Sequence, residues 1–162
     1  MPISLASSLP SARALLPPLR RLVRSALAAR GMRPGHIDVL LADDRALRAL
    51  NRRWRRLDRV TDVLSFGYDG NGAGSPRNVV SGDLAISLER VSEQARRFRC
   101  TLGEELARLV VHGALHLAGL DHKTAPERRA MRALEDRIMN GARAEIGAFD
   151  RGMGDPARTR HP

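Results

Sequence analysis

Three histidines that fall within eleven residues, His112, His116 and His122, are the side chains of this chain best suited to chemistry. His112 and His116 are four positions apart on a predicted helix, so their rings project from one face, a turn apart. Gly119 then ends the helix, and the following turn can bring His122 round as a third ligand. Three neutral imidazoles with one open position are typical of catalytic zinc, so the sequence predicts one Zn²⁺ per chain.

A zinc ion held in this way lowers the pKa of its bound water to about 7 and supplies hydroxide at neutral pH. Asp121, next to the third histidine, has two interpretations that the sequence leaves equally open. It can orient a ligand histidine by accepting a hydrogen bond, or it can simply be the turn residue that ends the helix.

The same histidine spacing occurs in metzincin proteases, whose pattern HExxHxxGxxH places a glutamate directly after the first histidine. Here that position is Gly113. The protease reaction needs this glutamate as its general base, and no substitute lies on the same helical turn. A zinc peptidase is therefore disfavoured.

The net charge of the chain is +10, and Lys123 is the only lysine among 28 basic residues. A small domain this basic attracts polyanions, nucleic acid above all. Aromatic residues make up only 3% of the chain, which argues against base-stacking platforms and favours contact through phosphate.

Arginine is concentrated in residues 45–59, where it occupies seven of fifteen positions. A helix that begins after Asp43 or Asp44 is predicted to bury one side, made of Leu47, Leu50, Trp54 and Leu57. The remaining side is then a basic surface suited to a phosphate backbone, in which Arg45 and Arg48 are interpreted as merely solvated.

Cys100 is the only cysteine, which excludes an intramolecular disulfide and favours a reducing, cytoplasmic setting. No stretch approaches the roughly 20 apolar residues of a membrane helix, so no membrane partner is expected. The first 37 residues carry six arginines and no acid, a composition that can mark an organelle transit peptide. Arginine is abundant along the whole chain, which makes that interpretation the weaker one.

Hydrophobic periodicity and capping signals predict a single α/β (α+β) domain over residues 1–150, followed by a disordered tail over 151–162. A small mixed sheet of three or four strands is expected, surrounded by about five helices. Strands are predicted at 37–41, 60–66 and 83–87, a loop at 67–81, and helices at 11–30, from 43 or 44, 87–99, 101–119 and from 124.

Three segments together resemble one family, the YbeY-type rRNA-maturation endoribonucleases of bacteria. Residues 50–66 are similar to the family pattern LNxxYRxxDxPTDVLSF, and residues 82–86 to its GDIxI strand. Residues 112–122 match its HGxLHLxGYDH signature, the most specific of the three. With the flanking helices, the resemblance covers roughly residues 12–148.

The resemblance implies a single-domain α/β fold in which His112, His116 and His122 bind zinc. It also implies that Arg55, at the position of a family arginine, supports catalysis across an RNA-binding cleft. The expected activity is single-strand RNA cleavage in maturation of the 16S rRNA 3′ end and in ribosome quality control. The expected partners are rRNA and the small ribosomal subunit.

Departures from the family pattern are modest: Trp54 replaces Tyr, Val60 replaces Pro, Gly67 a frequent Pro, and Leu120 Tyr. None removes a proposed ligand, although Leu120 adjoins the metal and can alter the lining of the cleft.

A general base is not evident from the sequence, since Asp62, Glu105 and Asp121 are only weak candidates. A non-catalytic ribosome-assembly factor with a structural zinc fits the charge and the metal motif equally well.

Overall fold

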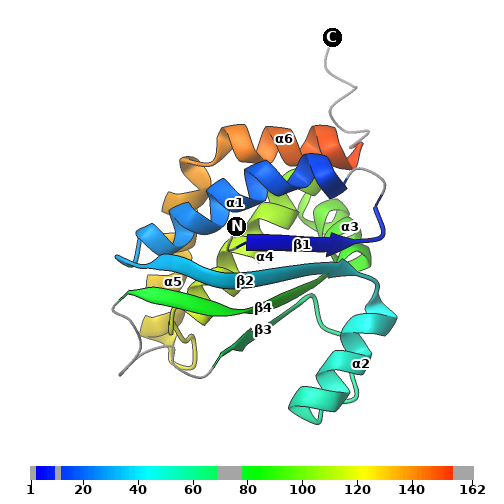
Figure 1. The fold of residues 1–162 in the computed structure, drawn as a ribbon, viewed down its shortest axis with the longest axis horizontal. Coiled ribbons are helices and arrows are strands. Elements are labelled where there is room, and N and C mark those ends of the chain that lie inside the picture. Colours follow the sequence, from blue (N-terminus) through cyan, green and yellow to red (C-terminus); the bar gives the residue numbers. More distant parts are fainter. Residues whose placement is uncertain (1–2, 10–11, 69–77, 155–162) are drawn as a thin grey trace.

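The computed structural model describes residues 3–9, 12–68 and 78–154, and Figure 1 shows their fold. Four strands form one mixed sheet in the order β1-β2-β4-β3. β1 and β4 run parallel to β2, and β3 is antiparallel to β4. The strands are β1 (Ile3–Ser7), β2 (Arg33–Ala42), β3 (Val63–Gly67) and β4 (Val79–Ser87).

Six helices accompany the sheet within the described residues, one more than predicted. They are α1 (Ala12–Ala28), α2 (Asp44–Arg55), α3 (Leu88–Phe98), α4 (Leu102–Leu117), α5 (Ala125–Asn140) and α6 (Arg143–Met153). The additional helix arises because the predicted last helix is divided after Asn140, where Gly141 caps α5 and the chain turns into α6. The α/β (α+β) class with a small mixed sheet is confirmed.

Helix α4 is the central element of the core. It packs against β3 and β4 and against α1, α3, α5 and α6. Eleven of its sixteen residues are buried, among them Leu106, Val110 and Leu115. Figure 1 shows α1 and α6 running side by side; α1 packs on β1 and β2, and both helices pack against α4. A helix enclosed in this way holds its side chains in fixed positions.

Local capping accounts for where several helices begin. Asp43, rather than Asp44, caps α2, its Oδ1 accepting from the Ala46 N–H at 2.8 Å. Ser87 caps α3 as predicted. Thr124 and Glu127 form the predicted reciprocal capping box at the start of α5.

The sheet is larger than predicted at three places, one of which is β2, predicted at 37–41 and observed at Arg33–Ala42. β1 was not predicted, and residues 79–81, predicted as part of a loop, belong to β4. β1 is a five-residue edge strand whose pairing partner, β2, lies more than thirty positions along the chain. Its short alternating pattern is too weak a local signal without that partner. β3 also begins at Val63, three residues later than predicted.

The predicted buried side of α2 is wrong at its C-terminal end. Leu47 is fully buried, but the side chains of Trp54 and Leu57 are 61% and 41% exposed. α2 ends at Arg55 because Arg56 adopts a left-handed conformation (φ 56°). In Figure 1 this end of the helix projects beyond the edge of the sheet.

The predicted tail begins too early, since residues 151–153 continue α6 and Gly154 caps it with a φ of 66°. Residues 155–162 of that tail, and residues 69–77 of the predicted loop, lie outside the described residues. Within the described part of the chain, none of the helices combines the length and apolarity needed to cross a membrane.

Candidate metal centre

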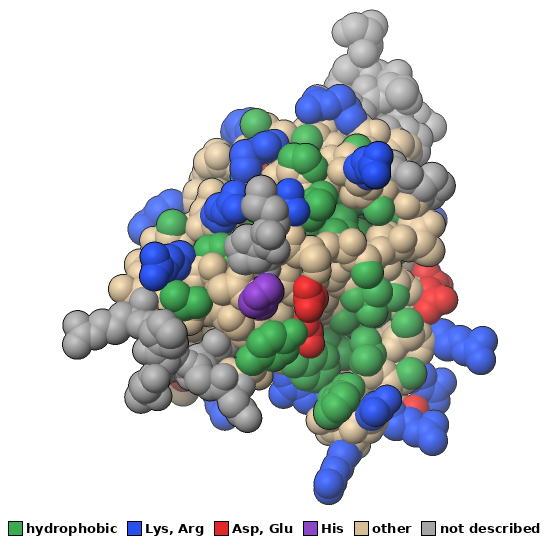
Figure 2. Space-filling view, viewed as in Figure 1, with side chains coloured by type: hydrophobic (Ala, Val, Ile, Leu, Met, Phe, Trp, Pro, Cys, Tyr) green, Lys and Arg blue, Asp and Glu red, His purple; other side chains and the backbone are tan. Residues whose placement is uncertain are grey.

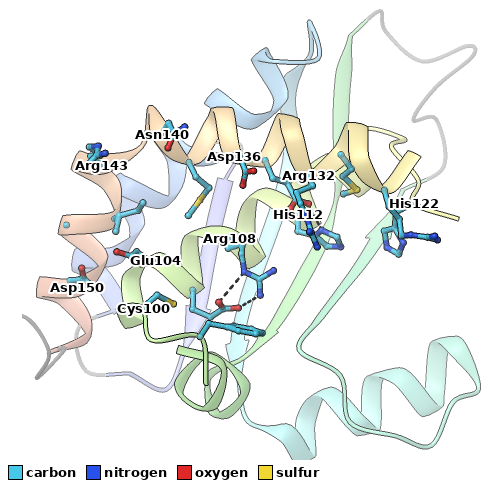
Figure 3. A pocket seen from close by; sticks show the side chains of 18 residues that line it. Cys100, Glu104, Arg108, His112, His122, Arg132, Asp136, Asn140, Arg143 and Asp150 are labelled. Atoms are coloured by element: carbon cyan, nitrogen blue, oxygen red, sulfur yellow. Dashed lines mark hydrogen bonds and ion pairs between the residues drawn. The ribbon is translucent and has the colours of Figure 1, made fainter. Parts of the chain in front are cut away.

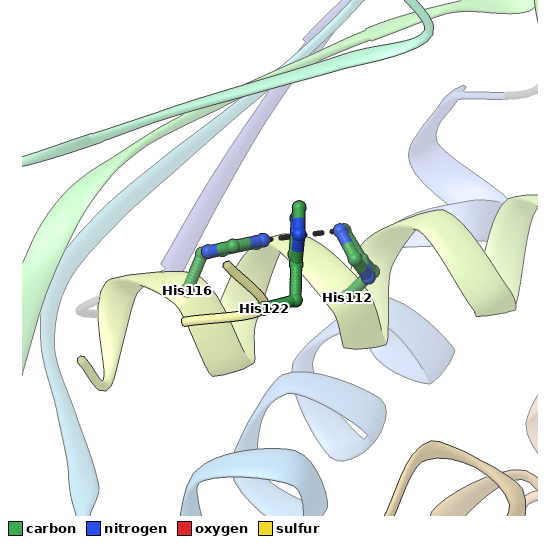
Figure 4. A group of neighbouring side chains, drawn as sticks. All are labelled: His112, His116 and His122. Carbon is green, nitrogen blue, oxygen red and sulfur yellow. Dashed lines mark hydrogen bonds between the residues drawn. The ribbon is translucent and has the colours of Figure 1, made fainter. Parts of the chain in front are cut away.

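The three histidines come from one helix and the turn that follows it. His112 and His116 lie on α4, which ends at Leu117. Gly119 then takes a φ of 94°, and the Leu120 N–H donates to the Leu115 carbonyl at 3.0 Å, which closes the helix end. The reversed chain returns His122 to the other two rings, as Figure 4 shows.

The ring nitrogens converge closely enough to share one ion. One ligand nitrogen from each histidine can be chosen so that all three lie within 4.8 Å of one another. The Nε2 atoms of His112 and His116 are 3.1 Å apart. Tetrahedral zinc with bonds of about 2.0–2.1 Å places neighbouring nitrogens about 3.3 Å apart, so this donor set suits zinc in both chemistry and spacing.

The surroundings of His116 favour its neutral form, the form that can bind a cation. Burial lowers the pKa of His116 below its usual value, and the positive charges that His112 and His122 can carry lower it further. A neutral imidazole leaves a lone pair for a cation.

The His112 ring is contacted by Glu135, a residue that the sequence did not indicate. Glu135 Oε1 lies 2.6 Å from His112 Nδ1. Asp121 instead caps its own turn, its Oδ1 accepting from the His122 backbone N–H at 2.8 Å, which lowers the pKa of Asp121. The turn-residue interpretation of Asp121 therefore holds. Glu135 lies 23 positions from His112 on another helix, so no local pattern connects the two.

Arg55, to which the family resemblance gives a catalytic role, lines the same depression as the histidines. A surface depression of about 730 Å³ is lined by all three histidines together with Arg55 and Arg59. The Arg55 Nη2 donates to the Ser65 carbonyl, and its guanidinium carbon is 5.0 Å from the centroid of the Phe66 ring. We call this the arginine-side depression.

A second depression of about 920 Å³ adjoins the histidines on the opposite side, between α4, α5 and α6 (Figure 3). His112 and His122 line both depressions. Cys100 also lines the second one, where burial raises its thiol pKa to about 11. The two depressions thus share His112 and His122 in their linings.

The weak general-base candidates Glu105 and Asp62 are both engaged with neighbours. Glu105 is 1% exposed, forms an ion pair with Arg108 and accepts from Gln94 Nε2 at 2.8 Å. Asp62 Oδ1 accepts from the Val63 N–H at 2.8 Å, and Asp62 lines the arginine-side depression. Of the two, only Asp62 borders the same depression as Arg55.

Gly113 shows why the metzincin glutamate has no counterpart. A Cβ at this position would lie 2.8 Å from Cδ2 of the buried Leu84 and 3.3 Å from Cγ2 of Val63. The helix therefore approaches the sheet too closely for any side chain unless the sheet residues move. The peptidase interpretation thus loses its required base for a structural reason.

On one face of the molecule, basic side chains are not confined to the region of α2. On the face seen in Figure 2, Lys and Arg side chains are spread around the periphery, several over the region of α2. Arg48 pairs with Asp58 at 2.8 Å, in keeping with its interpretation as a solvated residue.

Fold and site together define a small α/β protein with three clustered histidines that could hold a metal ion, beside an arginine. The family model described as endoribonuclease YbeY matches residues 14–143. The chain belongs to this family.

Relatives and a solved structure agree with this assignment. An endoribonuclease YbeY of an Anaeromyxobacter strain is 41% identical over 98% of this chain and 80% of its own length. The endoribonuclease YbeY of Moorella thermoacetica is 38% identical over 78% of this chain and 86% of its own. A solution structure from Thermotoga maritima is 25% identical and covers 99% of this chain and 97% of its own, with a TM-score of 0.63.

Proposed function

We propose that this protein is a zinc-dependent endoribonuclease that cuts single-stranded RNA in the cytoplasm, in maturation of the 16S rRNA 3′ end and in ribosome quality control. The observation that carries the proposal is the single depression lined by three convergent histidines and Arg55. The names of the relatives, all endoribonuclease YbeY, support RNA as the substrate and a phosphodiester bond as the bond cut.

His112, His116 and His122 would hold the ion, one nitrogen each, and leave a position open to water or phosphate. Bound zinc supplies a Lewis acid and lowers the pKa of a coordinated water. His116 is held ready for this role because its burial disfavours the protonated ring, which cannot bind a cation.

Arg55 would stabilise the charge that develops on the phosphate in the transition state. Its contacts with the Ser65 carbonyl and the Phe66 ring leave most of its five N–H donors available. These two contacts also hold the guanidinium in place before substrate arrives, so little ordering remains for the reaction step. Arg59 adds a second positive charge to the same depression.

The shape of the site suits a single strand. The arginine-side depression and the depression between α4, α5 and α6 share His112 and His122 in their linings, so a bound strand would have space on both sides of these histidines. Few aromatic residues are present to read bases, so we assign the choice of cleavage site to the ribosomal context, with small-subunit rRNA as the partner.

The test is cleavage of a short single-stranded RNA by the wild type and three variants, with zinc content measured for each. Arg55→Ala should keep its zinc and lose about 100- to 1000-fold in rate, as removal of one transition-state donor does. His116→Ala should lose both zinc and activity. Arg52→Ala is the control, because Arg52 lies on the same helix but not in the depression.

Equal cleavage by all four preparations would refute the nuclease and favour an assembly factor with a structural zinc. The chemical ends of the products identify the nucleophile. A 2′,3′-cyclic phosphate means that the ribose 2′-OH attacks, and a linear phosphate formed directly means that water does.

A further inference from the structure

We propose that Glu135 is a positioning residue of the metal centre, which holds His112 in the tautomer and orientation that present Nε2 to the cation. The inference rests on the proposed metal site and adds to it a residue from a different helix.

The geometry of the Glu135–His112 contact determines which nitrogen is free. A neutral imidazole has one N–H donor and one acceptor nitrogen, and a carboxylate can only accept. With Glu135 Oε1 2.6 Å from Nδ1, the proton of His112 resides on Nδ1. Nε2 is then unprotonated and faces His116 Nε2 at 3.1 Å. Two ring nitrogens at this distance need a proton or a cation between them.

The Glu135–His112 contact is also largely shielded from solvent, so it should affect the free energy of metal binding. The side chains of Glu135 and His112 are only 13% and 26% exposed. A carboxylate hydrogen-bonded to a ligand histidine fixes the ring and makes its free nitrogen more basic. Its negative charge, one imidazole ring away from the cation, also offsets part of the double positive charge of zinc.

The Glu135–His112 contact also helps to attach α5 to the rest of the molecule. Of the sixteen residues of this helix, Met131 and Ile138 are buried, and Glu135 lies between them on the same face. α5 therefore has a narrow apolar contact with the rest of the molecule. Bound zinc would add two further attachments: His122, just before the helix, and Glu135 through His112.

The first measurement is zinc affinity, by competition with a chromogenic chelator in the absence of RNA. Glu135→Ala should bind zinc about 10- to 100-fold more weakly than the wild type. Glu135→Gln, which keeps an acceptor but loses the charge, should lie between the two. Asp136→Asn is the matched control, since Asp136 is the next residue and lines the same depression, and its affinity should stay within about twofold.

The second measurement is hydrogen exchange of α5 with and without zinc. Zinc should slow exchange along α5 in the wild type and in Asp136→Asn, because ligand binding suppresses local opening. In Glu135→Ala at saturating zinc, protection should remain near His122 and be lost from the turns around residue 135. The same slowing in Glu135→Ala as in the wild type would overturn the proposal.

These readouts separate the positioning role from folding and from catalysis. If Glu135→Ala melts below the wild type without zinc, the nearly isosteric Glu135→Gln decides the affinity comparison. A variant affinity equal to wild type refutes the positioning role whether or not RNA is cut. If affinity falls as expected and wild type cuts no RNA, the positioning role stands and only the nuclease proposal fails.

Discussion

Helices α4 and α2 both carry residues of the site, but they are held in different ways. α4 buries eleven of its sixteen residues and contacts elements on every side. α2 buries only Leu47 and Asn51 of its twelve residues. The proposed ligands His112 and His116 are therefore positioned by the core itself, whereas Arg55 depends on a few local contacts near the end of a partly exposed helix.

The polar attachments of α2 lie at its two ends. Asp44 accepts from Ser87 Oγ at 2.6 Å and pairs with Arg90 at 3.0 Å. At the other end, Asn51 donates to the Arg59 carbonyl at 3.0 Å and Arg55 to that of Ser65. Because α2 and α4 are held by different contacts, the two halves of the site can be separated by experiment.

Removal of the metal should have the largest effect. Dialysis against a chelator should reduce RNA cleavage at least about 100-fold, and added zinc should restore it. The circular dichroism of the protein should barely change, because the core around α4 is built from a large cluster of buried apolar side chains. Global unfolding on chelation would show instead that the metal is part of the core, and the contrast between the two helices would fail.

A substitution that weakens the packing of α2 should leave zinc affinity unchanged. Leu47 is fully buried in a small cluster with Leu64 and Ala85, so Leu47→Ala should cost about 2–4 kcal/mol of unfolding free energy in urea titrations. Zinc affinity should remain near that of the wild type while cleavage falls, because Arg55 loses its framework. Leu115→Ala, in α4, should cost a similar amount and weaken zinc binding as well.

A larger side chain at Gly113 should disturb α4 and its histidines rather than α2. Its added Cβ would press against Leu84 and Val63, so Gly113→Ala should destabilise the protein by about 1–3 kcal/mol and weaken zinc binding through the neighbouring His112. Gly141→Ala is the control, since its Cβ would meet only ordinary contacts at 3.6 Å or more. Equal effects of the two substitutions on thermal unfolding would contradict the close approach of α4 to the sheet.

Trp54→Ala should have the smallest effect. The indole is 61% exposed and lies 5.1 Å from the Arg53 guanidinium, so its removal should change the unfolding free energy by no more than about 0.5 kcal/mol. A cost of several kcal/mol would mean that Trp54 is buried after all, as the periodicity of α2 had predicted.

Local features were the ones that could be read from the sequence. The spacing of His112 and His116, the caps at Asp43, Ser87 and Thr124, and the turn at Gly119 each involve residues within a few positions of one another. Such features depend on backbone periodicity and short-range hydrogen bonds, which every helix of the same sequence pattern shares. The arginine near the metal was anticipated from the family motif, not from periodicity.

What the sequence determined by itself was therefore the donor set and the helix that presents it. Only the tertiary structure decided which carboxylate meets His112, that β1 joins the sheet and that Trp54 faces solvent. The physical reason is the same in each case: these outcomes depend on which surfaces meet across long separations in the chain. Glu135 reaches its histidine only because α5 folds back along α4, and no spacing within the chain encodes that approach.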